Sequence, residues 1–141
     1  MKSCKYVLMV TAFFAITVQA QEIIKEGAGW NQVLVNSPGH ETAKLLKGQS
    51  YLIEIPDAAV NCLVNTEGKV IEVRFNNGFK GATSKGIKVG SPVKDLIAAY
   101  GEPQSVEKLK KAQKMFYPQI GMLFWVADKK VSQIVVYLAP K

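Results

Sequence analysis

Residues 86–103 read GIKVGSPVKDLIAAYGEP, and this stretch predicts a strand, a short amphipathic helix and an abrupt stop. Ser91 is a good capping residue, because its hydroxyl can accept a hydrogen bond from a free helix N–H. Pro92 then suits the first helical position, where a missing N–H costs nothing. Gly101 can adopt the left-handed backbone that ends a helix, and Pro103 prevents continuation. The helix between them has one apolar stripe at helical spacing, formed by Val93, Leu96, Ile97 and Tyr100.

A second copy of this start lies 54 residues earlier in the chain. Residues 33–38 read VLVNSP and match IKVGSP at 87–92 position for position. Ser37 and Pro38 would begin a helix over Pro38–Lys47, and Gly48 would end it. The repetition predicts two related units in tandem.

Each predicted helix is followed by three strand-like runs with a proline between the first and the second, Pro56 and Pro118. The runs are Ser50–Ile55, Ala58–Asn65 and Lys69–Phe75, then Lys114–Tyr117, Ile120–Ala127 and Lys130–Leu138. Because each unit alone has too little core, we expect an α+β fold. In it, two tandem α-β-β-β units, over about 30–76 and 84–139, form one antiparallel sheet with both helices packed on one face. The second unit carries an insertion, Gln104–Gln113, whose apolar spacing is weakly helical.

The first 20 residues are typical of a secretory signal peptide rather than of the fold. Lys2 and Lys5 precede an apolar run, Tyr6–Val18, and Val18-Gln19-Ala20 resembles a cleavage site. The run is shorter than the roughly 20 residues of a membrane span, so none is expected after its removal. We therefore predict an exported protein, periplasmic or secreted, whose single domain occupies residues 21–141.

The charge of the chain argues against a nucleic-acid partner. The full sequence has 18 Lys and Arg against 11 Asp and Glu, and Lys2 and Lys5 leave with the signal peptide. Arg74 is the one arginine, whereas base-reading proteins commonly use several arginines for bidentate contacts. A moderate lysine excess is typical of a solvated surface.

The sequence offers little for catalysis or metal binding. After cleavage Cys62 is the remaining cysteine, so no disulfide within the chain is possible, and its apolar strand predicts a buried thiol. His40 is the one histidine, which disfavours a zinc site or a catalytic triad. We expect no cofactor. A pair of carboxylates brought together by the fold stays open as a hydrolase alternative.

The second unit resembles the module shared by the beta-lactamase inhibitor protein and the small lipoprotein of the outer-membrane β-barrel assembly machine. The residues that carry the likeness are Gly86, Ile87, Val89, Gly90, Ser91, Asp95, Leu96, Tyr100, Gly101 and Pro103. The resemblance covers about 60 residues and implies a tandem fold, an extracytoplasmic setting and protein binding. The sequence lacks the cysteine that a lipoprotein has just after the apolar run, because Cys4 precedes that run.

Two sets of residues are candidates for binding. Leu123, Trp125 and Tyr137 are expected on the sheet face away from the helices, where they would serve as anchors. A covered face or a dimer seam is the alternative. Lys108, Lys110 and Lys111 of the insertion, with Lys114 beside them, could form a basic rim or meet an anionic surface. The alternative for these lysines is a solvated helix face.

Together these features predict a small exported protein-binding module without catalysis. Its partner would be another protein or an envelope component, and the oligomeric state is left open. The alternatives are a hydrolase that uses a carboxylate pair, and a binder of an anionic surface or a small ligand through the lysine-rich insertion.

Overall fold

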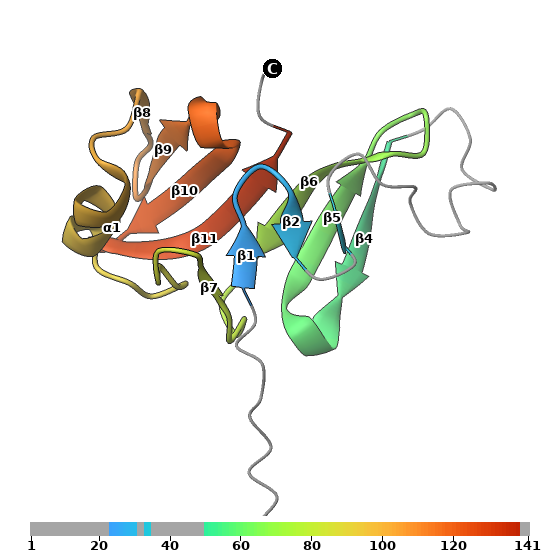
Figure 1. Cartoon of the computed structure of the whole chain (residues 1–141), viewed down its shortest axis with the longest axis horizontal. Helices are drawn as coiled ribbons and strands as arrows, with labels where there is room; N and C mark the ends of the chain where they lie inside the picture. Colours follow the sequence, from blue (N-terminus) through green and yellow to red (C-terminus); the bar gives the residue numbers. More distant parts are fainter. Residues whose placement is uncertain (1–22, 31–32, 35–49, 139–141) are drawn as a thin grey trace, which may run out of the picture.

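The computed structural model describes residues 23–30, 33–34 and 50–138, and these form a largely β structure with one helix (Figure 1). The predicted signal peptide and the predicted first helix, with Ser37, Pro38 and Gly48, lie outside these ranges, as does His40. A four-stranded sheet contains β1 (Ile23–Lys25), β2 (Gly29–Trp30), β3 (Val33–Leu34) and β7 (Ala82–Thr83). A seven-stranded sheet contains β4 (Tyr51–Ile55), β5 (Val60–Val64), β6 (Val70–Phe75), β8 (Ser105–Lys108), β9 (Gln113–Tyr117), β10 (Met122–Ala127) and β11 (Lys130–Tyr137).

The seven-stranded sheet is antiparallel throughout, in the order β4-β5-β6-β11-β10-β9-β8. Two consecutive three-stranded meanders meet where β6 pairs with β11, with Val73 opposite Val136. The six predicted strands and the single antiparallel sheet are therefore confirmed, with ends that shift by one or two residues. The small sheet was not predicted, and the fold is mostly β with a minor helix.

The two meanders share three local details. A short 3-10 helix follows the first strand of each, η2 (Pro56–Ala58) and η3 (Pro118–Ile120). Each ends at a residue with left-handed backbone, Ala59 at φ 56° and Gly121 at φ 63°. The third strand of each meander also carries a bulge, where Ile71 or Ser132 lacks an opposite residue.

The helix α1 spans Val93–Tyr100, and its start differs from the prediction. Pro92 has an extended backbone and flanks the helix instead of opening it. The Ser91 hydroxyl does not cap it either; Ser91 Oγ accepts a hydrogen bond from the Lys88 N–H at 2.9 Å. Gly101 ends the helix as expected, with φ at +79° and its N–H bonded to the carbonyl of Ile97.

The insertion is a strand rather than the weak helix that its spacing suggested. β8 pairs with β9, with Val106 opposite Met115, and the Leu109 N–H donates to the Ala112 carbonyl at 2.8 Å to close the turn. Three apolar residues at helical spacing are a weak signal. Pairing with the free edge of β9 gives the backbone of this segment its interstrand hydrogen bonds, whereas a single helical turn would leave most of its N–H and C=O groups without a partner in the chain.

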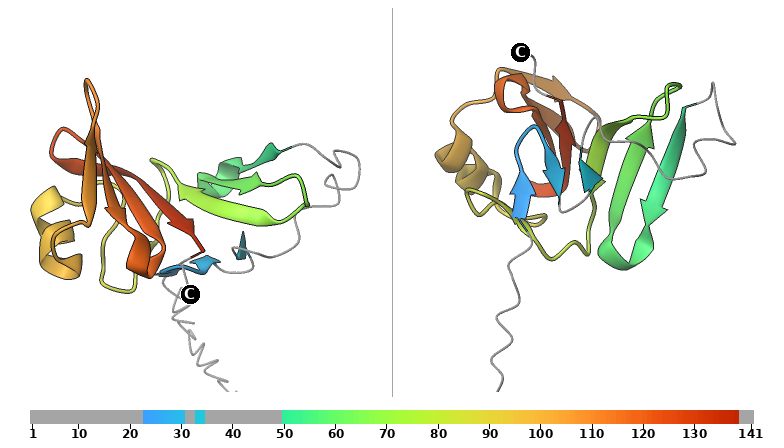
Figure 2. Two further views of the ribbon diagram at one scale, coloured as in Figure 1. Left: turned by 90° about the horizontal axis from the view of Figure 1, so that it is seen from above. Right: turned by 45° about the vertical axis from the view of Figure 1, so that its right-hand side comes forward.

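The core lies on one face of the large sheet, which we call the covered face. Met122, Phe124 and Val126 point there from β10 and are buried. Leu96 of α1 is fully buried against them, and the Tyr100 and Phe124 rings are 5.8 Å apart. In Figure 2, α1 and the small sheet lie along the same side of the large sheet. No helix among the described residues is long and apolar enough to cross a bilayer.

Candidate functional site

The opposite face of the large sheet is the candidate site, and we call it the open face. Successive side chains along a strand point to opposite faces, so the strand register shows which residues belong to this face. No helix or strand of the described ranges packs over it. Its members are Leu52, Glu54, Asn61, Leu63, Glu72, Arg74, Asn76, Lys114, Phe116, Leu123, Trp125, Gln133, Val135 and Tyr137.

An apolar group occupies the middle of the open face. Leu123 is opposite Val135 on one side and Phe116 on the other, and Trp125 follows two residues along β10. Val135 is 2% exposed although it does not belong to the main core cluster. This face therefore has a buried apolar residue of its own, apart from the main core cluster.

The Trp125 ring is held in place by a cation. The Lys114 ammonium lies 4.8 Å from the ring centroid, and the same ammonium is 3.0 Å from the Glu107 carboxylate. Cation–π contact and the ion pair fix both the lysine and the indole. Trp125 is half-buried, so it remains available to a partner.

Tyr137 lies on the same face, diagonal to Leu123 and opposite Glu72. Its hydroxyl points to the Met122 carbonyl at 3.4 Å, and partial burial raises the pKa of its phenol. Beyond Glu72, the same row continues with Leu63 and Leu52, and Leu52 is 44% exposed. The fold thus brings the three predicted anchors onto one face. Leu123 and Trp125 follow each other along β10, and Tyr137 lies diagonal to Leu123 on β11.

The polar groups of the open face largely satisfy one another. Arg74 donates two hydrogen bonds to one Glu72 oxygen, at 2.7 and 2.9 Å. Three amides form a chain, in which Gln133 donates to Asn76 at 2.7 Å and Asn76 donates to Asn61 at 3.2 Å. A partner that covers this face would meet few polar groups left without a hydrogen bond.

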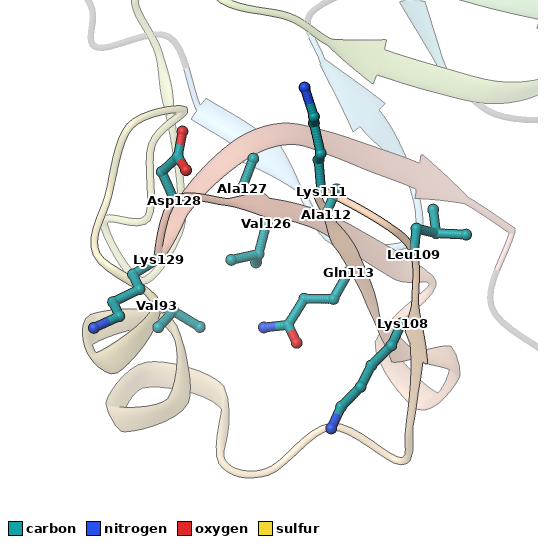
Figure 3. A pocket seen from close by; sticks show the side chains of 10 residues that line it. All are labelled: Val93, Lys108, Leu109, Lys111, Ala112, Gln113, Val126, Ala127, Asp128 and Lys129. Carbon is teal, nitrogen blue, oxygen red and sulfur yellow. The ribbon is translucent and has the colours of Figure 1, made fainter.

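Of the predicted lysines, Lys114 lies on this face, beside Trp125. Lys108 and Lys111 line a pocket of about 280 Å³ between α1, the β8–β9 turn and the β10–β11 turn, together with Lys129 (Figure 3). Lys110 is exposed on the same turn but does not line the pocket. In Figure 3 the three ammonium groups point in different directions around the mouth. Lys114 and Arg74 supply the cations of the open face.

A second pocket, of about 430 Å³, lies between the end of α1 and η3. Tyr100 and Tyr117 line it, and the Tyr117 hydroxyl donates to the Gly101 carbonyl at 2.9 Å. Burial, with the nearby charge of Glu102, raises the pKa of Tyr117 to about 12. Lys85 at the rim donates to the Ala99 carbonyl at 2.9 Å and covers the Tyr100 ring. These contacts hold the end of the helix.

Among the described carboxylates, Glu26, in the turn between β1 and β2, has the most side-chain partners. It accepts hydrogen bonds from the hydroxyls of Ser84 and of Tyr100, the latter at 2.6 Å. Burial raises the pKa of this carboxyl, but the hydrogen bonds together lower it by more, so the pKa lies below its usual value. Over the described ranges no three His, Cys, Asp or Glu side chains gather as metal ligands would. Glu26 therefore links the small sheet to α1.

Comparison of the chain with protein-family models, with curated proteins and with solved structures finds no match.

Several members of the open face were not predicted from the sequence. Phe116 and Lys114 alternate with the buried Met115 and Tyr117, and this period of two along β9 is the signal that would have placed them. Leu63 alternates in the same way with Cys62 and Val64. Leu52 and Arg74 reach the site only through strand pairing between distant segments, which no local pattern reveals.

Proposed function

We propose that the protein is a small exported binding module that docks a partner protein on the open face of its sheet. The observation that carries this proposal is the apolar centre of Leu123, Phe116 and Trp125 around the buried Val135, over which no described helix or strand packs. Aromatic side chains that are held in place and surrounded by satisfied polar groups are the usual anchors of protein interfaces.

The arrangement supports a protein partner more than a small molecule. The pockets beside Lys108 and beside Tyr117 lie away from the open face, which holds side chains from six strands instead. Its charges come in pairs, Arg74 with Glu72 and Lys114 with Glu107. An interface of this kind should resist salt, because the apolar anchors supply the affinity and the paired charges are screened weakly.

The proposal includes the tandem organisation, with two α-β-β-β units over about 30–76 and 84–139. The shared 3-10 turns at Pro56 and Pro118 and the shared bulges at Ile71 and Ser132 support it. It also includes export, supported by the charged and apolar character of residues 1–20. The setting would be a bacterial envelope or secretome.

The test begins with the full chain, expressed in its producing cell and captured from envelope and culture fractions at low and high salt. A protein retained at high salt is purified, and its dissociation constant is measured for the wild type, Trp125→Ala and Tyr137→Ala. We expect the Trp125→Ala change to weaken binding by roughly 30-fold, as the loss of a hot-spot side chain does.

Val106→Ala is the matched control, because Val106 is 42% exposed and lies on the strand β8 with its side chain on the covered-face side. It should leave the dissociation constant unchanged. If Trp125→Ala and Tyr137→Ala fold correctly and bind as tightly as the wild type, the open face is not the docking surface.

A further inference from the structure

All of the net charge of the described residues sits in three turns. The first turn of α1, the β8–β9 turn and the β10–β11 turn hold six lysines and two aspartates. The rest of the described chain is balanced, with seven basic and seven acidic residues. We call these lysines the basic end: Lys94, Lys108, Lys110, Lys111, Lys129 and Lys130.

The three turns form one surface. The Val93 N–H donates to the Lys129 carbonyl at 2.9 Å and so joins the start of α1 to the β10–β11 turn. Val93 and Lys129 line the same pocket as Lys108 and Lys111, which adds the β8–β9 turn (Figure 3). The fold thus gathers lysines that lie up to 36 residues apart in the sequence.

The lysines of the basic end are available to a partner. All six are exposed. The ion pairs among the described residues are Arg74 with Glu72 and Lys114 with Glu107, so none of the six has a carboxylate partner there. Asp95 and Asp128, the two acids of these turns, are also exposed and leave a clear positive excess.

An apolar side chain stands among these charges. Leu109 is 43% exposed, and it is flanked in sequence by Lys108 and Lys110. The Leu109 N–H donates to the Ala112 carbonyl at 2.8 Å, so the turn presents the leucine on a closed hairpin. In Figure 3 its side chain points away from Val126 and Gln113 at the centre of the pocket.

We propose that the basic end docks on an anionic lipid bilayer, with Leu109 entering the headgroup region and the lysines on the lipid phosphates. The ammonium groups diverge, so they cannot converge on one small anion, whereas a surface of many charges suits them. Each lysine held near an anionic surface strengthens binding by about five-fold. Interfacial amphipathic helices combine lysines that meet anionic lipids with leucines that enter the headgroup region, and this hairpin offers the same two kinds of side chain. The open face is made of other residues and would stay accessible.

The experiment is co-sedimentation of the full chain with two kinds of vesicle, phosphatidylcholine alone and phosphatidylcholine mixed with phosphatidylglycerol. The apolar run Tyr6–Val18 is the same in every variant, so any contribution it makes to the partition coefficient cancels in the ratio between two variants. We expect the partition coefficient on anionic vesicles to fall by roughly a hundred-fold in the triple variant K108Q/K110Q/K111Q. Leu109→Ser should lower it by about ten-fold through lost burial of the leucine.

The matched control is K25Q/K69Q/K80Q, which removes the same charge from exposed lysines elsewhere and should bind like the wild type. Equal partition of the wild type and K108Q/K110Q/K111Q would overturn the proposal, and so would equal binding to vesicles of phosphatidylcholine alone. A third arm competes the vesicles with soluble polyphosphate. If polyphosphate binds as tightly and Leu109→Ser has no effect, the basic end is a site for a polyanionic chain and the bilayer assignment is wrong.

Discussion

Lys114 holds its ammonium 4.8 Å from the centre of the Trp125 ring, on the face of the sheet that no described element covers. The same lysine pairs with Glu107 at 3.0 Å, so the indole is oriented by a short chain of side chains from three neighbouring strands. An aromatic ring that is fixed before a partner arrives loses less conformational entropy on binding. This relationship supports the proposal that a partner docks on the open face.

Residues of the open face should matter less for folding than residues of the core. Leu96→Ala empties a fully buried position and should lower the free energy of unfolding by about 2–5 kcal/mol. Leu52→Ala makes the same chemical change at a position that is 44% exposed and should cost less than about 1 kcal/mol. Urea denaturation of both variants measures the difference, and equal losses would mean that another part of the chain covers the open face.

The two left-handed residues that end η2 and η3 give a paired test of the backbone. Gly121→Ala places a Cβ at φ 63° and should destabilise the protein by about 1–2 kcal/mol. Ala59→Gly relieves the same strain at φ 56° but removes a methyl group that packs on the core, so its effect should be small. Thermal or urea denaturation of the two variants measures both changes in the free energy of unfolding. A large loss in Ala59→Gly together with none in Gly121→Ala would contradict the assigned backbone.

Glu26 should make stability depend on acid. Burial raises the pKa of its carboxyl, but the hydrogen bonds from Ser84 and Tyr100 lower it more, so the folded pKa lies below its usual value of 4.5. The folded state therefore favours the charged form, and its contribution is present above pH 4.5 and lost as pH falls through the lower folded pKa. Urea denaturation of wild type and Glu26→Gln from pH 3 to 7 tests this. The two curves should approach each other in acid, and a constant gap at every pH would exclude this role for Glu26.

Cys62 should be unreactive in the folded protein. It is 2% exposed, and burial raises the pKa of its thiol to about 11. The folded state therefore favours the protonated thiol, so this contribution to stability is lost as pH rises from the usual thiol pKa of 9.0 through about 11. Labelling with a maleimide in a Cys4→Ser background should be slow at neutral pH and should become fast in urea. Fast labelling without denaturant would show that this part of the sheet opens readily.

Local patterns predicted the strands well because alternation and turn residues are local features. Val73 and Phe75 are buried and alternate with the charged Glu72 and Arg74, and Asp128-Lys129 forms a tight turn with both residues at positive φ. The failures have a physical cause. Ser91 was assigned a role at the helix start that its local bond to Lys88 prevents, and the insertion became a strand because β9 had a free edge.

The candidate site was harder to predict than the strands. That β6 pairs with β11 depends on contacts between residues about 60 positions apart, so no window of sequence shows that Arg74 lies beside Val135. Leu123 and Trp125 could be predicted because β10 alternates regularly, and Tyr137 because it lies near the end of the strand paired with it. The lysines of the insertion could be predicted as exposed, but their place beside α1 and not beside Trp125 follows from the turn geometry alone.

Site-specific photo-crosslinking in the producing cell tests the central claim most directly. A benzophenone amino acid replaces Leu123 on the open face, or Val106 on the other side of the sheet, in the otherwise unchanged full chain. We predict a covalent adduct with one protein partner from position 123 and none from position 106. If position 123 gives no adduct, or if position 106 gives the same one, the open face is not where this protein binds its partner.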